Sequence, residues 1–219
     1  MRTLEMKSHK TDGLLISFCG LDGCGKSTMI RMLSKCLERQ GYSIKLTKQP
    51  TDAVRKAGIF RTYMDLEDHS GYEYRALSLL AAADRIQHNS QMIIPCLEKG
   101  DIVLSDRYFY SCLANLRARG YVTDSWIYEI SQNITRPDIS FFLDVSVPVA
   151  ISRVRSRPEE KDRYIDEQLQ HILRDEYIKI CKNNGGILID SSGEASKTFE
   201  TIWSYVYSKL EEKNEQRKR

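Results

Sequence analysis

The sequence predicts an α/β domain in which a parallel, five-stranded sheet carries helices on both faces. Short apolar runs alternate with long amphipathic runs, as in chains of strand–helix repeats. The apolar runs are nearly continuous rather than alternating, which is typical of strands covered on both faces. A chain of 219 residues fits one such domain, with two small domains as the alternative. The predicted strands are Leu14–Phe18, Ser43–Thr47, Asp101–Ser105, Ile139–Asp144 and Gly186–Asp190.

The amphipathic runs predict the helices. They span residues 28–37, 72–98, 163–182 and 196–212. In the longest of them apolar residues recur at helical spacing, and Gly100 follows as a stop signal. Two charged segments, 65–71 and 156–162, are predicted to be mobile loops. The ends of the chain, 1–12 and the basic segment 211–219, are predicted to be flexible tails around a domain at 13–210.

The segment Gly20–Ser27 follows the first predicted strand and matches the phosphate-binding pattern G-x-x-x-x-G-K-[ST] at every fixed position. In such a loop backbone N–H groups point at phosphate oxygens, the lysine reaches the β- and γ-phosphates, and the hydroxyl can ligate Mg²⁺. The helix that follows would place the positive end of its dipole beneath the phosphates. The sequence therefore predicts a nucleoside triphosphate site made of Gly20, Leu21, Asp22, Gly23, Cys24, Gly25, Lys26, Ser27 and Thr28.

A carboxylate and a guanidinium end the third predicted strand, at Asp106 and Arg107. The carboxyl ends of parallel strands face the ligand crevice, so both side chains are expected beside the phosphate loop. Asp106 is predicted to hold Mg²⁺ or one of its waters together with Ser27, and Arg107 to clamp a phosphoryl oxygen. The alternative is an ion pair between these two neighbours that caps the strand.

Composition argues against several other classes of protein. A net charge of +3 gives no reason to expect nucleic-acid binding, and the six cysteines show no C-x-x-C pair that would indicate zinc. No apolar stretch approaches the ~20 residues of a membrane span, and the first residues lack the apolar core of a signal peptide. We therefore expect a cytoplasmic protein without a nucleic-acid or membrane partner.

The order of the motifs resembles the thymidylate kinase family of nucleoside monophosphate kinases over about residues 13–209. The motifs are the phosphate loop, Thr47-Lys-Gln-Pro50, Leu79–Arg85, Asp106-Arg-Tyr108, Pro137–Asp144 and the segment Arg153–Arg163. The resemblance implies a three-layer P-loop kinase fold with a short lid at about 153–163. It also implies transfer of the ATP γ-phosphoryl group to a deoxynucleoside 5′-monophosphate, with dTMP as the expected acceptor, Mg²⁺ as cofactor and a homodimer as the assembly.

The resemblance further implies roles for single residues. Lys26, Arg107 and Asp106 would be catalytic, together with an arginine of the lid, because the phosphate loop itself contains no arginine. Arg153, Arg155 and Arg157 are the available lid arginines, one of which closure of the lid could deliver to the reaction; Arg153 and Arg157 are the catalytic candidates. The acceptor would be bound by Asp22, Lys48, Pro50, Arg85, Arg107, Tyr108 and Asn115.

Five positions of the expected acceptor pocket depart from the family's pattern: Lys48, Gln49, Ala81, Asn115 and Leu116. Lys48 keeps a positive charge but loses the fork of an arginine, and Ala81 stands where the family has a phenylalanine that stacks on thymine. Another side chain would have to supply that stacking, or the affinity for the base would fall. The candidates are Tyr108, Phe109 and Tyr110.

These departures leave other functions open. The chain could phosphorylate another pyrimidine nucleoside monophosphate, or a deoxynucleoside, although Gln49 stands where such a kinase would need a carboxylate base. It could also be a nucleotide-binding protein without catalysis. A GTPase-like switch is disfavoured, because no N-K-x-D tetrapeptide is present.

Overall fold

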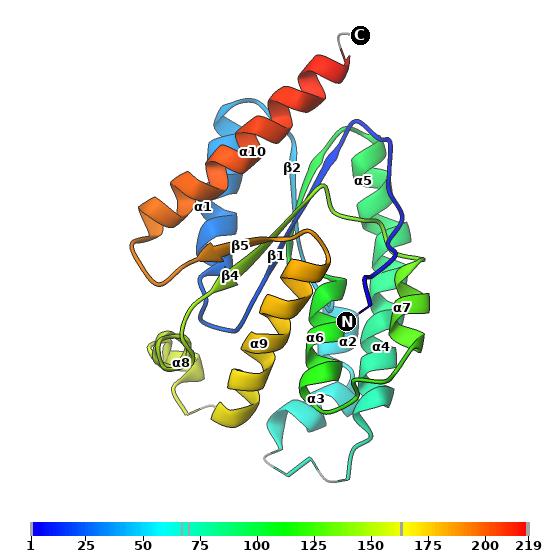
Figure 1. The fold of residues 1–219 in the computed structure, drawn as a ribbon, viewed down its shortest axis with the longest axis vertical. Helices are drawn as coiled ribbons and strands as arrows, with labels where there is room; N and C mark the ends of the chain where they lie inside the picture. The colour runs from blue at the N-terminus through cyan, green and yellow to red at the C-terminus, as the bar shows by residue number, and fades with distance from the viewer. Residues whose placement is uncertain (1, 67, 70, 163, 218–219) are drawn as a thin grey trace.

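The computed structural model describes residues 2–66, 68–69, 71–162 and 164–217. Its five strands form one parallel sheet in the order β2-β3-β1-β4-β5 (Figure 1). The strands are β1 (Leu14–Cys19), β2 (Ile44–Lys48), β3 (Ile102–Asp106), β4 (Ile139–Asp144) and β5 (Ile187–Asp190). The five predicted strands are confirmed within one residue at each end.

Helices lie on both faces of the sheet. Helices α1 and α10 pack together on one face, and α4, α6 and α9 pack on the other (Figure 1). The helices are α1 (Lys26–Arg39), α2 (Asp52–Arg55), α3 (Gly58–Asp65), α4 (Tyr74–His88), α5 (Ile94–Glu98), α6 (Phe109–Ala118), α7 (Trp126–Ser131), α8 (Val147–Arg155), α9 (Glu167–Asn183) and α10 (Ala195–Arg217). The three-layer α/β fold is thereby confirmed.

Burial differs between the central and the edge strands. The inner strands β1, β3 and β4 are buried along their lengths apart from Asp144, as the continuous apolar runs predict. The edge strands are not covered on both faces: Leu46 of β2 is 57% exposed and Leu188 of β5 is 43% exposed. For these two strands the prediction of full coverage is wrong, because the flanking helices leave these side chains at the sheet edges exposed.

The helix predicted over 72–98 is continuous but irregular. It consists of α4, a π-helical turn at Asn89–Ile93 and α5. Pro95 lies in the first turn of α5, and proline has no N–H for the regular helical hydrogen bond. The widened turn immediately before it also leaves Asn89 in a position to accept a hydrogen bond from the Thr135 N–H at 3.1 Å.

The N-terminal segment is packed rather than flexible, which corrects the prediction for residues 2–12. Leu4 and Met6 are buried, and the Leu4 N–H donates to the Asn184 side chain at 2.9 Å. Lys7 forms an isolated parallel bridge with Thr135. Apolar side chains so close to the end of the chain anchor it, because their burial offsets the entropy of ordering the backbone.

The basic C-terminal segment is also ordered as far as the structure describes it. Helix α10 continues to Arg217, which corrects the predicted tail at 211–219, and residues 218–219 lie outside the described part. The Lys213 ammonium donates to the backbone carbonyls of Thr11 and Gly13 and lies 3.8 Å from an Asp138 oxygen. These contacts join the last helix to the start of the domain.

The two segments predicted to be loops hold little regular structure. The segment 156–162 contains a single 3₁₀ turn at Pro158–Glu160, and α9 begins at Glu167 rather than at the predicted residue 163. Arg163, and residues 67 and 70 of the segment 65–71, lie outside the described part. No helix of the described residues is long and apolar enough to cross a bilayer.

Candidate active site

The phosphate loop connects β1 to α1 and packs closely against its surroundings. Gly20 and Gly23 have φ angles of 134° and 84°, which disfavour side chains. A Cβ on Gly20 would lie 2.4 Å from the Leu143 carbonyl oxygen, and one on Gly23 would lie 2.1 Å from that of Ala150 in α8. Glycine is therefore required at both positions by conformation and by space.

Lys26 is buried at the start of α1, with its ammonium turned into the loop. The Nζ group donates to the carbonyl oxygens of Gly20 at 3.1 Å and Leu21 at 2.7 Å, and it lies 3.7 Å from the Cys24 sulfur. The two carbonyl partners are neutral, so they orient the ammonium without neutralising it. The remaining charge is available to a phosphate oxygen.

Ser27 and Asp106 lie together at the carboxyl ends of the central strands. The Ser27 hydroxyl donates to Asp106 Oδ2 at 3.5 Å, whereas the buried Asp106 Oδ1 has no partner among the described residues. No group of three or more His, Cys, Asp or Glu side chains that could hold a metal occurs in the part of the chain described. A hydroxyl and one carboxylate suit Mg²⁺, which keeps several waters and takes its other ligands from substrate phosphates.

Arg107 has a strained backbone that neighbouring groups hold in place. Its φ angle is 69°, in the left-handed region that residues other than glycine rarely adopt. Its N–H donates to the Phe18 carbonyl at 2.8 Å, and its carbonyl accepts from the Ser105 hydroxyl at 2.7 Å. Such strain persists only where surrounding contacts fix it, and it turns this side chain back toward the phosphate loop.

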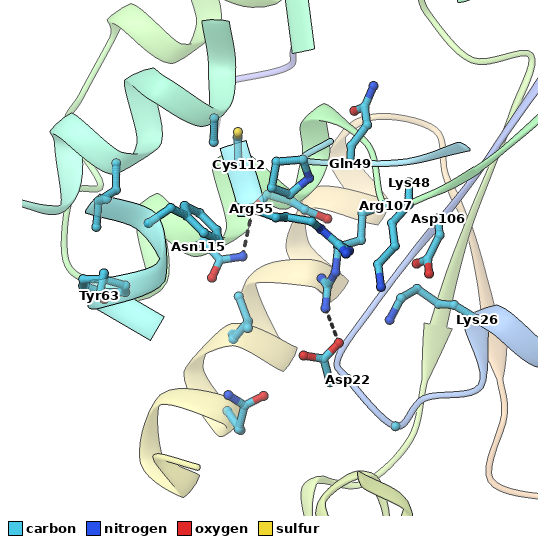
Figure 2. A pocket seen from close by; sticks show the side chains of 18 of the residues that line it. Asp22, Lys26, Lys48, Gln49, Arg55, Tyr63, Asp106, Arg107, Cys112 and Asn115 are labelled. Atoms are coloured by element: carbon cyan, nitrogen blue, oxygen red, sulfur yellow. Dashed lines mark hydrogen bonds and ion pairs between the residues drawn. The ribbon is translucent and has the colours of Figure 1, made fainter. Parts of the chain in front are cut away.

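The ion pair of Arg107 is made with Asp22 of the phosphate loop, at 2.6 Å (Figure 2). The alternative in which Arg107 pairs with Asp106 to cap the strand is therefore wrong. The same guanidinium donates to the Gly20 carbonyl at 3.3 Å and to the Tyr177 hydroxyl at 2.9 Å. Burial opposes its charged form, but Asp22, and then Tyr177 and Asp106, raise the pKa of Arg107 well above its usual value.

One cavity of about 870 Å³ brings most of the predicted site together. It extends from the phosphate loop across the ends of β2 and β3 to α3, α4 and α6. The predicted residues that line it are Asp22, Gly23, Gly25, Lys26, Ser27, Thr28, Lys48, Pro50, Arg85, Asp106, Arg107, Asn115 and Arg157. A second cavity of about 360 Å³ lies against the other side of the loop and is lined by Gly23, Cys24, Gly25, Thr28, Arg153 and Arg157, among others.

The two expected lid arginines have different surroundings. Arg153 donates to the carbonyl oxygens of Ser191 at 3.0 Å and Ser192 at 3.3 Å, so it is tied to the loop that follows β5. Arg157 is exposed and lines both cavities, between α8 and the 3₁₀ turn. Arg155 is exposed and lines neither.

The far half of the large cavity carries polar atoms without partners. Arg85 is 2% exposed; one of its terminal nitrogens donates to the Ala81 carbonyl at 2.8 Å, while its Nε has no partner among the described residues. The buried Gln49 Oε1 and Ser78 Oγ also lack partners there, and both residues line the cavity. Buried polar groups are normally satisfied, so these atoms are available to a polar ligand.

Lys48 carries the positive charge on this side of the cavity. It is the last residue of β2 and lies in register with Asp106 of β3. Partial desolvation, followed by the nearby positive charge of Arg55, lowers the pKa of its ammonium. An anion placed between Lys48 and Arg55 would relieve that repulsion.

Tyr108 does not belong to the site, which corrects the prediction that it binds the acceptor. The side chain is fully buried in the core, and its hydroxyl donates to the Thr135 carbonyl at 2.6 Å. Phe109 and Tyr110, the other candidate stacking rings, are buried as well, and so is Leu116. None of the four lines either cavity, because they point from α6 and its N-terminus into the core.

Sequence reasoning missed an aromatic and basic wall of the large cavity, which comes from α3 and the ends of α4 and α6. The wall includes Phe60, Tyr63, Tyr74 and Arg119. The Arg119 guanidinium lies 4.0 Å from the centre of the Tyr74 ring and donates to the Tyr63 hydroxyl at 3.0 Å and to Asn115 Oδ1 at 2.9 Å. Arg119 follows Asn115 by one helical turn, and this spacing could have revealed it.

Comparison with known proteins gives a consistent result. The family model described as thymidylate kinase matches residues 18–202. The chain is 37% identical over 168 residues to a probable thymidylate kinase of Thermococcus kodakarensis, covering 74% of this chain and 82% of that protein. It is 30% identical over 208 residues to a thymidylate kinase of Bifidobacterium longum, covering 92% of this chain and 98% of the relative.

Proposed function

Because this chain belongs to the thymidylate kinase family, we propose that it transfers the γ-phosphoryl group of ATP to the 5′-phosphate of dTMP, giving dTDP and ADP. The observation that carries the proposal is the large cavity itself. At one end lie the phosphate loop and Lys26, and at the other lies Arg85 with its unpartnered Nε. Asp106 lies beside Ser27 at the donor end, and Arg107, which lines the same cavity, would meet the phosphates of donor and acceptor.

Phosphoryl transfer needs alignment of the two substrates and neutralisation of the charge that spreads over the moving group. Lys26 supplies a buried positive charge to the donor, and Arg107 supplies a second one at the end of β3. A Mg²⁺ ion held by Ser27 and Asp106 would neutralise charge on the donor phosphates. Arg157 lines both cavities and is the lid arginine best placed to approach the transferred group.

Recognition of the acceptor follows from the other half of the cavity. The Arg85 Nε–H needs an acceptor atom, and a carbonyl oxygen of a pyrimidine base supplies one. Lys48 faces the acceptor's 5′-phosphate with a point charge in place of an arginine fork. Tyr74 and Phe60 provide rings in the cavity wall that can contact the base.

We extend the proposal to cofactor, assembly and location. Mg²⁺ is supported by the unpartnered Asp106 Oδ1 beside Ser27. Helix α4 buries Leu77 and Ala82 in the core, and its Leu79 is 46% exposed. This outward apolar side chain supports a homodimer in which α4 contributes to the interface. A cytoplasmic location agrees with the six free cysteines.

The decisive experiment is an ATP-coupled assay with dTMP, dUMP, dCMP, UMP, CMP, AMP and thymidine as acceptors. We expect dTMP to give the highest kcat/KM and thymidine to give no product. A Lys26→Met variant, prepared in parallel, controls for contaminating kinases and should be inactive. A kcat/KM for dTMP that is about tenfold or more below that of another acceptor would refute the substrate assignment, and phosphorylation of thymidine would favour a nucleoside kinase.

A further inference from the structure

Tyr177 of α9 contacts Arg107 from within the protein core. Its side chain is buried, and it lines neither cavity, so it cannot touch a substrate bound there. Its hydroxyl lies 2.9 Å from a terminal nitrogen of Arg107 and 3.0 Å from the Ser111 hydroxyl on α6. One hydroxyl thus connects the central arginine of the site to a neighbouring helix.

The direction of these two hydrogen bonds is fixed by chemistry. A guanidinium can only donate, so the Tyr177 oxygen must accept from Arg107. Burial raises the pKa of Tyr177 to about 12, so its hydroxyl keeps its proton at neutral pH. That proton is directed at Ser111, which is the acceptor at 3.0 Å.

Arg107 depends on few contacts for its orientation. Its ion pair is made with Asp22, whose side chain is 43% exposed, and its contact with the Gly20 carbonyl is long, at 3.3 Å. Both of these partners belong to the phosphate loop, which itself must contact a nucleotide. Among the hydrogen bonds that the guanidinium makes with the described residues, the one to the Tyr177 hydroxyl has its partner outside the loop.

Two residues that precede Tyr177 in α9 anchor this helix, one to β4 and the other to α6. The Arg174 guanidinium donates two hydrogen bonds to the Asp144 carboxylate at the end of β4, both at 2.6 Å. The buried Glu176 accepts from Arg117 of α6 at 2.6 Å. The hydroxyl of Tyr177 is therefore a rigid reference point for the guanidinium.

We propose that Tyr177 is a positioning residue for Arg107, whose guanidinium it holds toward the phosphate loop in the orientation that phosphoryl transfer requires. The inference rests on the proposed kinase function for its activity readout. It adds a residue that acts through Arg107 and not through the substrate.

The test compares Tyr177→Phe with Tyr110→Phe. Tyr110 is an appropriate control because it is buried, its hydroxyl accepts from Ser140 at 3.3 Å, and both tyrosine rings pack on Phe142. We expect Tyr177→Phe to lower kcat by about tenfold and to change KM for ATP by less than about twofold, since a hydrogen bond to a charged group is lost and the ATP site is kept. Tyr110→Phe should leave kcat unchanged, and both variants should have similar melting temperatures.

A second measurement does not depend on turnover. In ¹⁵N NMR spectra, rotation of the Arg107 guanidinium should be restricted in the wild-type protein and in Tyr110→Phe, and faster in Tyr177→Phe. If Tyr177→Phe does not fold, Ser111→Ala removes the partner of the Tyr177 proton and should also speed this rotation; the rotation is its readout because Ser111 lines the large cavity. Wild-type kcat in Tyr177→Phe, equal losses in both tyrosine variants, or unchanged guanidinium rotation would overturn the inference. Absence of dTMP phosphorylation by the wild-type protein would instead refute the proposed function, and the NMR comparison would still decide the role of Tyr177.

Discussion

Replacing Gly23 by alanine tests the close approach between the phosphate loop and α8. The added Cβ would lie 2.1 Å from the Ala150 carbonyl oxygen and 2.9 Å from its carbon, and both are backbone atoms that no side-chain rotation can move. The φ angle of 84° at Gly23 adds a conformational penalty. Either the loop or α8, which carries Arg153, must shift.

The expected loss of stability has two parts. A left-handed alanine costs about 1–2 kcal/mol, and inserting a methyl group into packed surroundings costs about 1–3 kcal/mol. The sum of about 2–5 kcal/mol corresponds to a fall in melting temperature of roughly 4–20 °C for a chain of this size. Gly41→Ala isolates the first part, because Gly41 has a φ angle of 87° and nothing lies within 4 Å of the position that an added Cβ would take.

The measurements are thermal unfolding by circular dichroism and ATP binding by calorimetry. Gly23→Ala should lower the melting temperature clearly more than Gly41→Ala, and it alone should weaken ATP binding, because the displaced loop cannot direct its N–H groups at phosphates. Equal melting temperatures and equal ATP affinities in the two variants would show that the loop is not constrained by α8 as the structure indicates.

Three other substitutions test separate parts of the site. Arg157→Ala should lower kcat by at least about 10³-fold while leaving ATP affinity nearly unchanged; equal losses in both would show that Arg157 only binds. Asp106→Asn should raise the Mg²⁺ concentration needed for half-maximal rate by about tenfold or more, because the ion loses its carboxylate ligand, and an unchanged requirement would exclude that ligand. Glu176→Gln should destabilise the protein by about 1–3 kcal/mol at pH 7, since Arg117 loses its charged partner. Although burial raises it, hydrogen bonds from Arg117 and Lys179 lower the folded-state pKa of Glu176 below its ordinary value of 4.5, so its contribution is present above that pH and is lost as the pH falls through the folded pKa. The melting temperature of Glu176→Gln should therefore fall less steeply on acidification than that of the wild type, and parallel curves would contradict the assignment.

Predictions succeeded where the chemistry is local in the chain. The residues Gly20–Ser27 form a phosphate loop through their own backbone and the adjoining strand and helix, so a short pattern is sufficient to identify them. The strand that ends at Asp106 is similarly identified by its apolar run and by the carboxylate after it. The packing of the N-terminal segment was missed, because Leu4 and Lys7 contact Asn184 and Thr135, which lie in distant segments that no local pattern indicates.

In the half of the large cavity that is expected to bind the acceptor, the predictions failed where they depended on the direction of a side chain. Tyr108 directly follows Arg107, but the left-handed backbone at Arg107 and the start of α6 turn the ring into the core. Tyr63 lies in the eight-residue helix α3, whose short apolar pattern is too weak to indicate which wall it forms. The contact between Arg107 and Tyr177 joins residues 70 positions apart and depends on the packing of α9 against α6.

The packed N-terminal segment has a consequence for the order of events during synthesis. Leu4 is synthesised well before its hydrogen-bond partner Asn184, which is 180 residues further along the chain. At about 5–20 residues per second, the segment waits roughly 9–36 s for that partner to be made. The segment that holds Leu4 can therefore dock only late in synthesis, and during that interval the nascent chain exposes Leu4 and Met6 to whatever binds emerging apolar segments.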